Sequence, residues 1–142
     1  MNIGRREVVV TGLGAVSPFG HTADALWEGV ARGKSGINWI ESLGELDPEN
    51  YPVRYAGEVT NFDVDRLLKK HTEVRLEKSV QMALVAAQEA LEQAGLLTGE
   101  NALREGTNPI SVIAGSGHGA CHETEGPFQA FFTRGPRALR PM

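Results

Sequence analysis

The sequence predicts an α/β protein with mostly parallel core strands and helices packed against them. Two observations support this fold class. First, two short β-branched segments, Val8–Val10 and residues 109–114, each lead directly into a glycine-rich stretch. Segments of this kind suit strands buried on both faces of a parallel sheet. Second, the longest helical pattern, from Glu73 to Ala94, is apolar nearly all round in its middle. Such a helix packs on more than one side.

Composition narrows the class of protein. The 142 residues suffice for one ordinary domain. A hydrophobic content of 41% and a net charge of −4 indicate a soluble globular protein and argue against a nucleic-acid partner, which favours a basic face. No window approaches the ~20 apolar residues of a membrane span. The single cysteine, Cys121, excludes an intrachain disulfide framework and fits the reducing cytoplasm.

The first helix is expected soon after the opening glycines. Thr22 is a good N-cap, Asp24 complements the helix dipole in the first turn, and Gly33 ends the helix. Residues 34–37 predict a turn into a short extended piece. Residues 41–52 are polar and irregular, so we expect a surface excursion there.

The middle of the chain returns to regular structure. Residues 53–59 show a loose strand alternation, and Asn61 or Asp63 can cap a short helix that runs through Leu68. The long helix from Glu73 to Ala94 follows, with Gly95 as its stop. Its inner stripe recurs at helical spacing and consists of Val80, Ala83, Leu84, Ala87, Leu91 and Ala94.

The last third contains a polar loop at 98–109, the second core strand and a further helix. Pro127 is expected to start that helix, which carries three phenylalanines and is closed by Gly135-Pro136. The phenylalanines are Phe128, Phe131 and Phe132.

Gly12 and Gly14 invite a dinucleotide-binding interpretation. The fingerprint requires a third Gly or Ala where Ser17 stands, and it requires the helix to open at once towards the pyrophosphate. Here the first cap comes only at Thr22. The pattern therefore favours a structural turn over a phosphate cradle, although glycine pairs in general mark either positive φ or close backbone packing. A dinucleotide-dependent reductase stays as a disfavoured alternative.

Other candidate sites are weaker. Ser116 lacks the glycines two residues to either side that a nucleophile elbow needs. The cluster His118, Cys121, His122 and Glu123 has no second ligand pair for a closed zinc site, so no metal is expected. Cys121 and His122 are adjacent, and adjacent side chains seldom face each other, which argues against an activated thiol.

Taken together, the motifs resemble the β-ketoacyl-acyl-carrier-protein synthases of the type II kind. The resemblance rests on V-V-V-T-G-L-G-A-V-S-P-F-G at 8–20, A-L-W-E-G-V-A-R-G-K-S-G-I at 25–37, F-D-V-D at 62–65, V-R-L-E-K-S-V-Q-M-A-L-V-A-A-Q-E-A-L at 74–91, I-A-G-S-G-H-G-A at 113–120 and R-G-P-R at 134–137. Departures are local: Glu77 stands where Asp is usual, Ser79 where an aromatic is common, and Ala120 where Gly is usual.

The resemblance implies a thiolase-like fold, of which residues 1–142 form an incomplete N-terminal part that ends before the nucleophile motif. It implies a homodimeric cytoplasmic acyltransferase of fatty-acid or polyketide synthesis that works with an acyl carrier protein and malonyl and acyl thioesters. The implied reaction is a decarboxylative Claisen condensation, which uses a cysteine in a T-A-C-S/A-S motif and two histidines and requires no dissociable cofactor. None of these motifs is present, so we expect no catalytic residue in the chain and no condensing activity from it alone.

One position of the family's site falls inside the chain. His118 stands between the glycines of G-S-G-x-G, and in relatives the resemblance places this residue near the acyl pocket, where a histidine would raise the polarity. Two further alternatives stay open: a non-catalytic partner resembling a chain-length factor, which docks on an intact synthase, and a free-standing structural domain.

Overall fold

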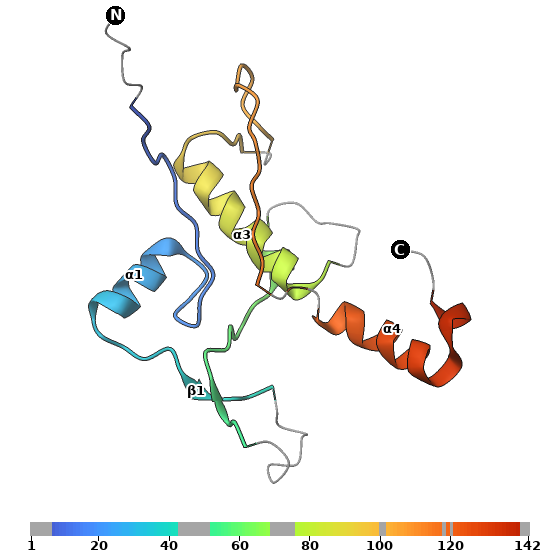
Figure 1. The fold of residues 1–142 in the computed structure, drawn as a ribbon. Helices are drawn as coiled ribbons and strands as arrows, with labels where there is room; N and C mark the ends of the chain where they lie inside the picture. Colours follow the sequence, from blue (N-terminus) through green and yellow to red (C-terminus); the bar gives the residue numbers. More distant parts are fainter. Residues whose placement is uncertain are drawn as a thin grey trace, which may run out of the picture.

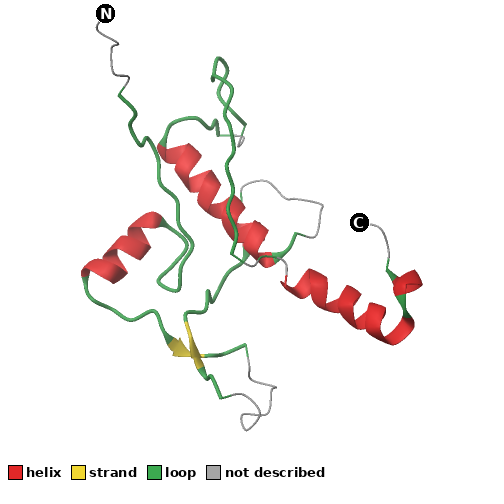
Figure 2. Ribbon diagram, in the orientation of Figure 1, coloured by secondary structure: helices red, strands yellow, loops and turns green. Residues whose placement is uncertain are grey.

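The computed structural model describes residues 7–42, 52–68, 76–99, 102–117, 119 and 121–139. Four helices, one two-stranded sheet and one 3-10 turn make up its regular structure in these ranges (Figures 1 and 2). In chain order they are α1 (Ala23–Ala31), β1 (Asn38–Trp39), β2 (Tyr55–Ala56), α2 (Val64–Leu67), α3 (Lys78–Gln93), α4 (Cys121–Arg134) and η1 (Pro136–Ala138).

The two shorter helices begin where local sequence signals place them. The Thr22 hydroxyl accepts a hydrogen bond from the backbone N–H of Ala25, and Gly33 follows the helix with a φ of 64°. Asp63 caps α2 by accepting from the N–H groups of Asp65 and Arg66. The predictions for both helices are confirmed, with Asp63 as the cap of the second.

The long helix α3 starts later than the sequence pattern predicts. The expected start at Glu73 lies outside the described residues, but Glu77 is extended and its carboxylate accepts from the backbone N–H and hydroxyl of Ser79. The N-cap therefore sits at Glu77, because a side-chain acceptor there satisfies an orphan donor of the first turn. The stop is confirmed, since Gly95 has a φ of 69°.

Helix α4 begins six residues before the predicted start. Pro127 lies inside the helix and not at its first turn. Proline in a helix interior has no N–H to offer the preceding turn. The prediction was wrong because the residues from Cys121 onward already adopt helical backbone. Gly135 closes the helix as expected. It has a φ of 79°, and its N–H donates a hydrogen bond of 2.9 Å to the carbonyl oxygen of Phe131.

The sheet of the described residues is a short antiparallel hairpin. Asn38 pairs with Ala56 and Trp39 with Tyr55. The Trp39 and Tyr55 rings meet edge to face at 5.5 Å, and the Arg54 guanidinium lies 5.8 Å from the centre of the Trp39 ring. The strand expected within 53–59 is thus present as β2, although only two residues long.

The opening glycines make a close helix contact instead of a turn. A β-carbon on Gly12 would lie closer than 3.0 Å to the carbonyl oxygen of Ala90 on α3. A β-carbon on Gly14 would likewise lie closer than 3.0 Å to the carbonyl oxygen of Ala86. The chain reverses only later, where Ser17 and Gly20 exchange backbone hydrogen bonds of 2.8 and 3.1 Å. The expected structural turn at Gly12 and Gly14 is therefore corrected to close backbone packing, the other role that glycine pairs serve.

The first predicted core strand, Val8–Val10, has no strand partner in the described part of the chain, and the residues that follow it run along α3. Leu13 N–H donates to the side chain of Gln93 at 2.6 Å, and Ala15 N–H donates to Glu89 at 3.0 Å. The segment therefore passes from the C-terminal end of α3 towards its N-terminal end (Figure 1). Val8 is 94% exposed, as expected for an extended segment that no strand covers.

The second predicted core strand runs in the same direction. Arg104 N–H bonds to the carbonyl of Leu96, just beyond the C-terminal end of α3. A β-carbon on Gly119 would lie 3.6 Å from the hydroxyl of Ser79, in the first turn of α3. Residues 109–114 thus run parallel to the first segment (Figure 1), yet neither segment forms a paired strand in the described part of the chain. The expected parallel pairing is not present, because strands need neighbours to bond to, and Ile113 is 98% exposed.

Candidate functional site

The glycine-rich loop after residue 114 lies beside the first turn of α3. His118, the one site residue predicted from the sequence, is outside the described residues. Its neighbours are described: a β-carbon on Gly119 would meet the Ser116 hydroxyl at 3.0 Å and the Ser79 hydroxyl at 3.6 Å. The loop therefore passes close to the first turn of α3. Among the described residues, no histidine forms a hydrogen bond with Ser116.

The cluster of possible ligands predicted around Cys121 lies at the start of α4. Cys121 and His122 open α4 as consecutive helical residues. Within the described ranges no three His, Cys, Asp or Glu side chains come together as a metal-binding group. His71 lies outside the described residues.

His21 joins two segments of the chain. Its Nε2 lies 3.2 Å from the carbonyl oxygen of Thr60, and its ring meets that of Phe62 edge to face at 5.4 Å. This histidine links the turn before α1 to the segment before α2. Its contacts are those of a packing residue.

The structure also bears on the dinucleotide alternative. The backbone of α3 occupies the space next to Gly12 and Gly14. The carboxylate of Glu89 accepts from the N–H of Ala15 at 3.0 Å. It also accepts from the N–H of Ala23, which lies 2.9 Å from one carboxylate oxygen and 3.1 Å from the other. A pyrophosphate binds through free N–H groups at a helix N-terminus, and here a carboxylate already takes them. The geometry argues against that function.

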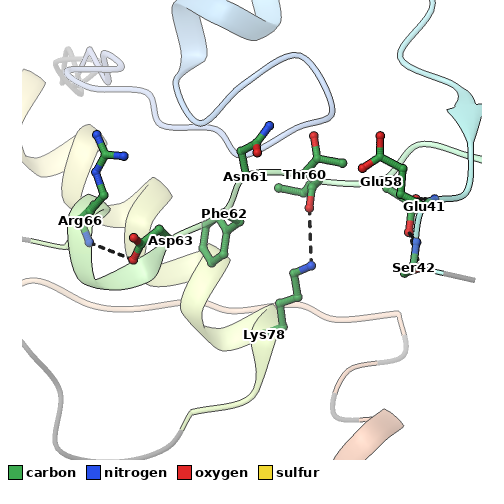
Figure 3. Close-up of a pocket in the computed structure, with 10 residues that line it drawn as sticks. Glu41, Ser42, Glu58, Thr60, Asn61, Phe62, Asp63, Arg66 and Lys78 are labelled. Atoms are coloured by element: carbon green, nitrogen blue, oxygen red, sulfur yellow. Dashed lines mark hydrogen bonds between the residues drawn. The ribbon is translucent and has the colours of Figure 1, made fainter. Parts of the chain in front are cut away.

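A polar cavity of about 700 Å³ opens between the hairpin, α2 and the start of α3 (Figure 3). Three carboxylates and two cationic side chains share its lining. The lining residues are Glu41, Ser42, Glu58, Val59, Thr60, Asn61, Phe62, Asp63, Arg66 and Lys78. No sequence motif predicts this cavity, because its lining residues come from three separate segments of the chain.

Glu58 organises one wall of the cavity. Its carboxylate accepts from the backbone N–H of Glu41 at 2.6 Å, from the N–H of Ser42 at 3.4 Å and from the Ser42 hydroxyl. The hydroxyl of Ser42 is the largest cause that lowers the pKa of Glu58 below its ordinary value, and the N–H of Glu41 is the next. Hydrogen bonds to the charged form favour that form.

The opposite wall carries the positive charge. Lys78 Nζ lies 3.5 Å from the carbonyl oxygen of Val59, drawn as the dashed line at Lys78 in Figure 3. Its charge makes the smallest contribution to the lowered pKa of Glu58. Asn61 holds a φ of 53°, which a non-glycine residue seldom adopts. The described lining residues include no cysteine or histidine, so this part of the cavity offers charge and hydrogen bonding without a thiol or an imidazole.

A second, apolar cavity of about 530 Å³ lies between α1 and the opening segment. Trp27, Val30 and Leu13 line it and are more than half exposed. In the described part of the chain no helix is both long and apolar enough to cross a membrane.

Comparison with known proteins places these features in a family. Residues 5–138 match the family model described as β-ketoacyl synthase, N-terminal domain. The chain is 37% identical over 139 residues to the 3-oxoacyl-[acyl-carrier-protein] synthase 2 of Vibrio cholerae serotype O1, and this match covers 97% of the chain and 32% of the relative. The synthases of the same name from Staphylococcus aureus strain COL and Vibrio harveyi are 35% and 36% identical, over 96% and 97% of the chain and 31% and 32% of those relatives.

The chain thus spans about a third of the length of the curated relatives it matches. The family model covers all but a few residues at each end, and the matched region includes both glycine-ended segments and α3. The chain belongs to the β-ketoacyl synthase family, in the region of its N-terminal domain.

Proposed function

We propose that this chain contributes the N-terminal part of a 3-oxoacyl-[acyl-carrier-protein] synthase, an acyltransferase of fatty-acid synthesis. The observation that carries the proposal is the match of residues 5–138 to the N-terminal domain of this family. The close packing of Gly12 and Gly14 on α3 supports it, because it gives these glycines a structural role and removes the main competing interpretation.

The proposed reaction is a decarboxylative condensation. An acyl group passes from the carrier-protein thioester to a cysteine thiolate, which releases the carrier-protein thiol. Malonyl-carrier protein then loses CO₂, and the resulting carbanion attacks the acyl-enzyme carbonyl. The new C–C bond expels the cysteine thiolate and yields a 3-oxoacyl thioester. A cysteine whose pKa is lowered by a helix N-terminus or a nearby cation suits the nucleophilic step. The proposed reaction requires no dissociable cofactor.

The chain itself would supply the scaffold of this site and none of its catalytic residues. Residues 1–142 would form an N-terminal domain portion that precedes the nucleophile motif. In the complete enzyme, the segments at 7–11 and 109–114 would pair as parallel strands of a thiolase-like sheet, with α3 packed on one face. The proposed enzyme is a cytoplasmic homodimer that meets the acyl carrier protein as its partner.

His118 is the proposed substrate-binding residue. Its neighbours Ser116 and Gly119 lie by the first turn of α3, and a histidine in this loop would add a polar group to an acyl pocket. In a chimera that carries residues 1–142 in place of the matched region of the Vibrio cholerae relative, His118→Phe is expected to shift the preferred acyl-chain length. An unchanged product distribution would argue against the assignment, and Glu105→Phe serves as the control for adding an aromatic elsewhere, because Glu105 is exposed and lies outside the two extended segments.

The same chimera tests the function as a whole. We expect it to condense an acyl primer with malonyl-carrier protein, with release of CO₂, whereas the isolated 142-residue chain forms no 3-oxoacyl product. A folded chimera without condensing activity would contradict the proposal, as would condensation by the isolated chain.

A further inference from the structure

The first turn of α3 and the glycine-rich loop bring two serine hydroxyls to one place. Among the described residues, the atoms nearest to a β-carbon on Gly119 would be the hydroxyl oxygen of Ser116 at 3.0 Å and that of Ser79 at 3.6 Å. Both serines are exposed. A ligand that lies along the loop at Gly119 would therefore meet two oxygen atoms, one from the loop and one from the helix.

Glu77 fixes the role of the Ser79 hydroxyl. The Glu77 carboxylate accepts a hydrogen bond of 2.8 Å from the backbone N–H of Ser79 and a second one from the Ser79 hydroxyl. A serine hydroxyl has one proton and two lone pairs. Because that proton is donated to Glu77, the oxygen of Ser79 offers only lone pairs to any further group and acts towards it as an acceptor.

Ser116 complements this acceptor, because its hydroxyl can donate as well as accept. Gly119 adds no side chain between the two oxygens. A hydroxyl group held there can donate to Ser79 and accept from Ser116. A carbonyl oxygen can only accept, an ammonium group can only donate, and a saturated hydrocarbon chain does neither. The two serines therefore match a hydroxyl group better than the other three.

The residues of this wall are also positions at which the sequence departs from the pattern described above. Glu77 stands where Asp is usual, and Ser79 stands where an aromatic residue is common. The structure shows that these two departures are hydrogen-bonded to each other and that Ser79 lies beside Gly119. An aromatic ring at position 79 would present carbon atoms to the loop, whereas this chain presents an oxygen.

We propose that Ser79 is a specificity-determining residue and that the synthase prefers an acyl primer whose chain carries a hydroxyl group. The proposal rests on the proposed function, because that function puts the glycine-rich loop at the acyl pocket. Ser79 accepts a hydrogen bond from the hydroxyl group of the primer, and Ser116 donates one to it. Glu77 is a positioning residue, which acts only through the hydroxyl of Ser79.

The test uses the chimera described above. It compares saturated acyl-carrier-protein primers with primers of equal length that carry a hydroxyl group at successive carbons. We expect a higher kcat/KM for a hydroxylated primer, and Ser79→Ala should lower this preference about fivefold, through KM, as expected for the loss of one neutral hydrogen bond. Ser79→Thr should restore the preference. Ser42→Ala is the matched control, because the Ser42 hydroxyl also donates to a carboxylate but lies at the polar cavity.

The outcomes separate the inference from the proposed function. A chimera that condenses saturated and hydroxylated primers equally well overturns the inference and leaves the function intact, and so does a preference that persists in Ser79→Ala. An equal loss of kcat/KM for all primers in Ser79→Ala would indicate a merely structural role and would also overturn it. A folded chimera that condenses no primer contradicts the proposed function, and the inference fails with it.

Discussion

Gly14 lies so close to α3 that a β-carbon at this position would overlap the carbonyl oxygen of Ala86. The overlapping atom belongs to the helix backbone, so no side-chain rotation relieves it. Gly12 stands in the same relation to Ala90, one turn further along α3. The pair of glycines therefore sets the distance at which the opening segment lies along the long helix.

Gly14→Ala is expected to destabilise this packing by about 1–3 kcal/mol, the usual cost of overpacking a close contact. Urea unfolding followed by circular dichroism of α3 measures the change. Gly99→Ala is the control, because a β-carbon on Gly99 meets no atom within 4 Å. Equal stability of the two variants would show that the segment does not pack on α3 in solution.

Glu89→Ala is expected to loosen the start of α1 from α3. Its carboxylate accepts from the N–H groups of Ala15 and Ala23, and hydrogen bonds to charged groups contribute about 1.5–3 kcal/mol. Amide hydrogen exchange at Ala15 and Ala23 should accelerate. Glu28→Ala is the control, since the ion pair of Glu28 with Arg32 lies on the surface and such pairs contribute little. Unchanged exchange in Glu89→Ala would contradict the bridging role.

Glu58 is expected to titrate below the ordinary range of a glutamate. A depressed folded-state pKa means that its hydrogen bonds stabilise the folded chain above the unfolded pKa, about pH 4.3, and are lost as the pH falls through the folded value. An NMR titration of the Glu58 carboxyl carbon measures it. Ser42→Ala should raise the pKa most, because the Ser42 hydroxyl is the largest cause, whereas Lys78→Gln should raise it least. The reverse order would contradict this account of the wall around Glu58.

Thr22→Ala is expected to cost about 1 kcal/mol of helix stability, because the hydroxyl of Thr22 caps α1. Thr22→Ser keeps the hydroxyl and should restore most of the loss. The change is measured as thermal unfolding of the chimera, in which α1 has its full surroundings. If the serine variant is as unstable as the alanine variant, the hydroxyl is not the stabilising group.

The isolated chain is expected to associate with itself and to be poorly soluble. Val8–Val10 and residues 112–113 are exposed apolar backbone-edge segments, and such segments recruit other chains. Sedimentation velocity over a range of concentrations should show mass rising without a defined endpoint. A monodisperse monomer with a cooperative thermal transition would contradict this expectation.

Some helix ends could be predicted from nearby residues alone, and others could not. Thr22, Asp63 and Gly95 act within a few residues of themselves, so their roles as caps and stop followed from the sequence and are confirmed. The starts of α3 and α4 did not follow. At α3 the start depends on the carboxylate of Glu77, which accepts from an orphan N–H of the first turn.

Periodicity and motif order, read from the sequence alone, determined the family, the long apolar helix and the presence of two extended β-branched segments. Only the tertiary structure decided that Gly12 and Gly14 face the carbonyls of α3, that the two extended segments run in the same direction, and that the Glu58 carboxylate accepts from Ser42 on one wall of a polar cavity. The physical reason is distance in the chain. Helix caps and periodicity depend on residues that are close in the sequence. The hydrogen bond from Ala15 to Glu89 joins residues 74 positions apart, so it forms only after the two segments have come together in the folded chain.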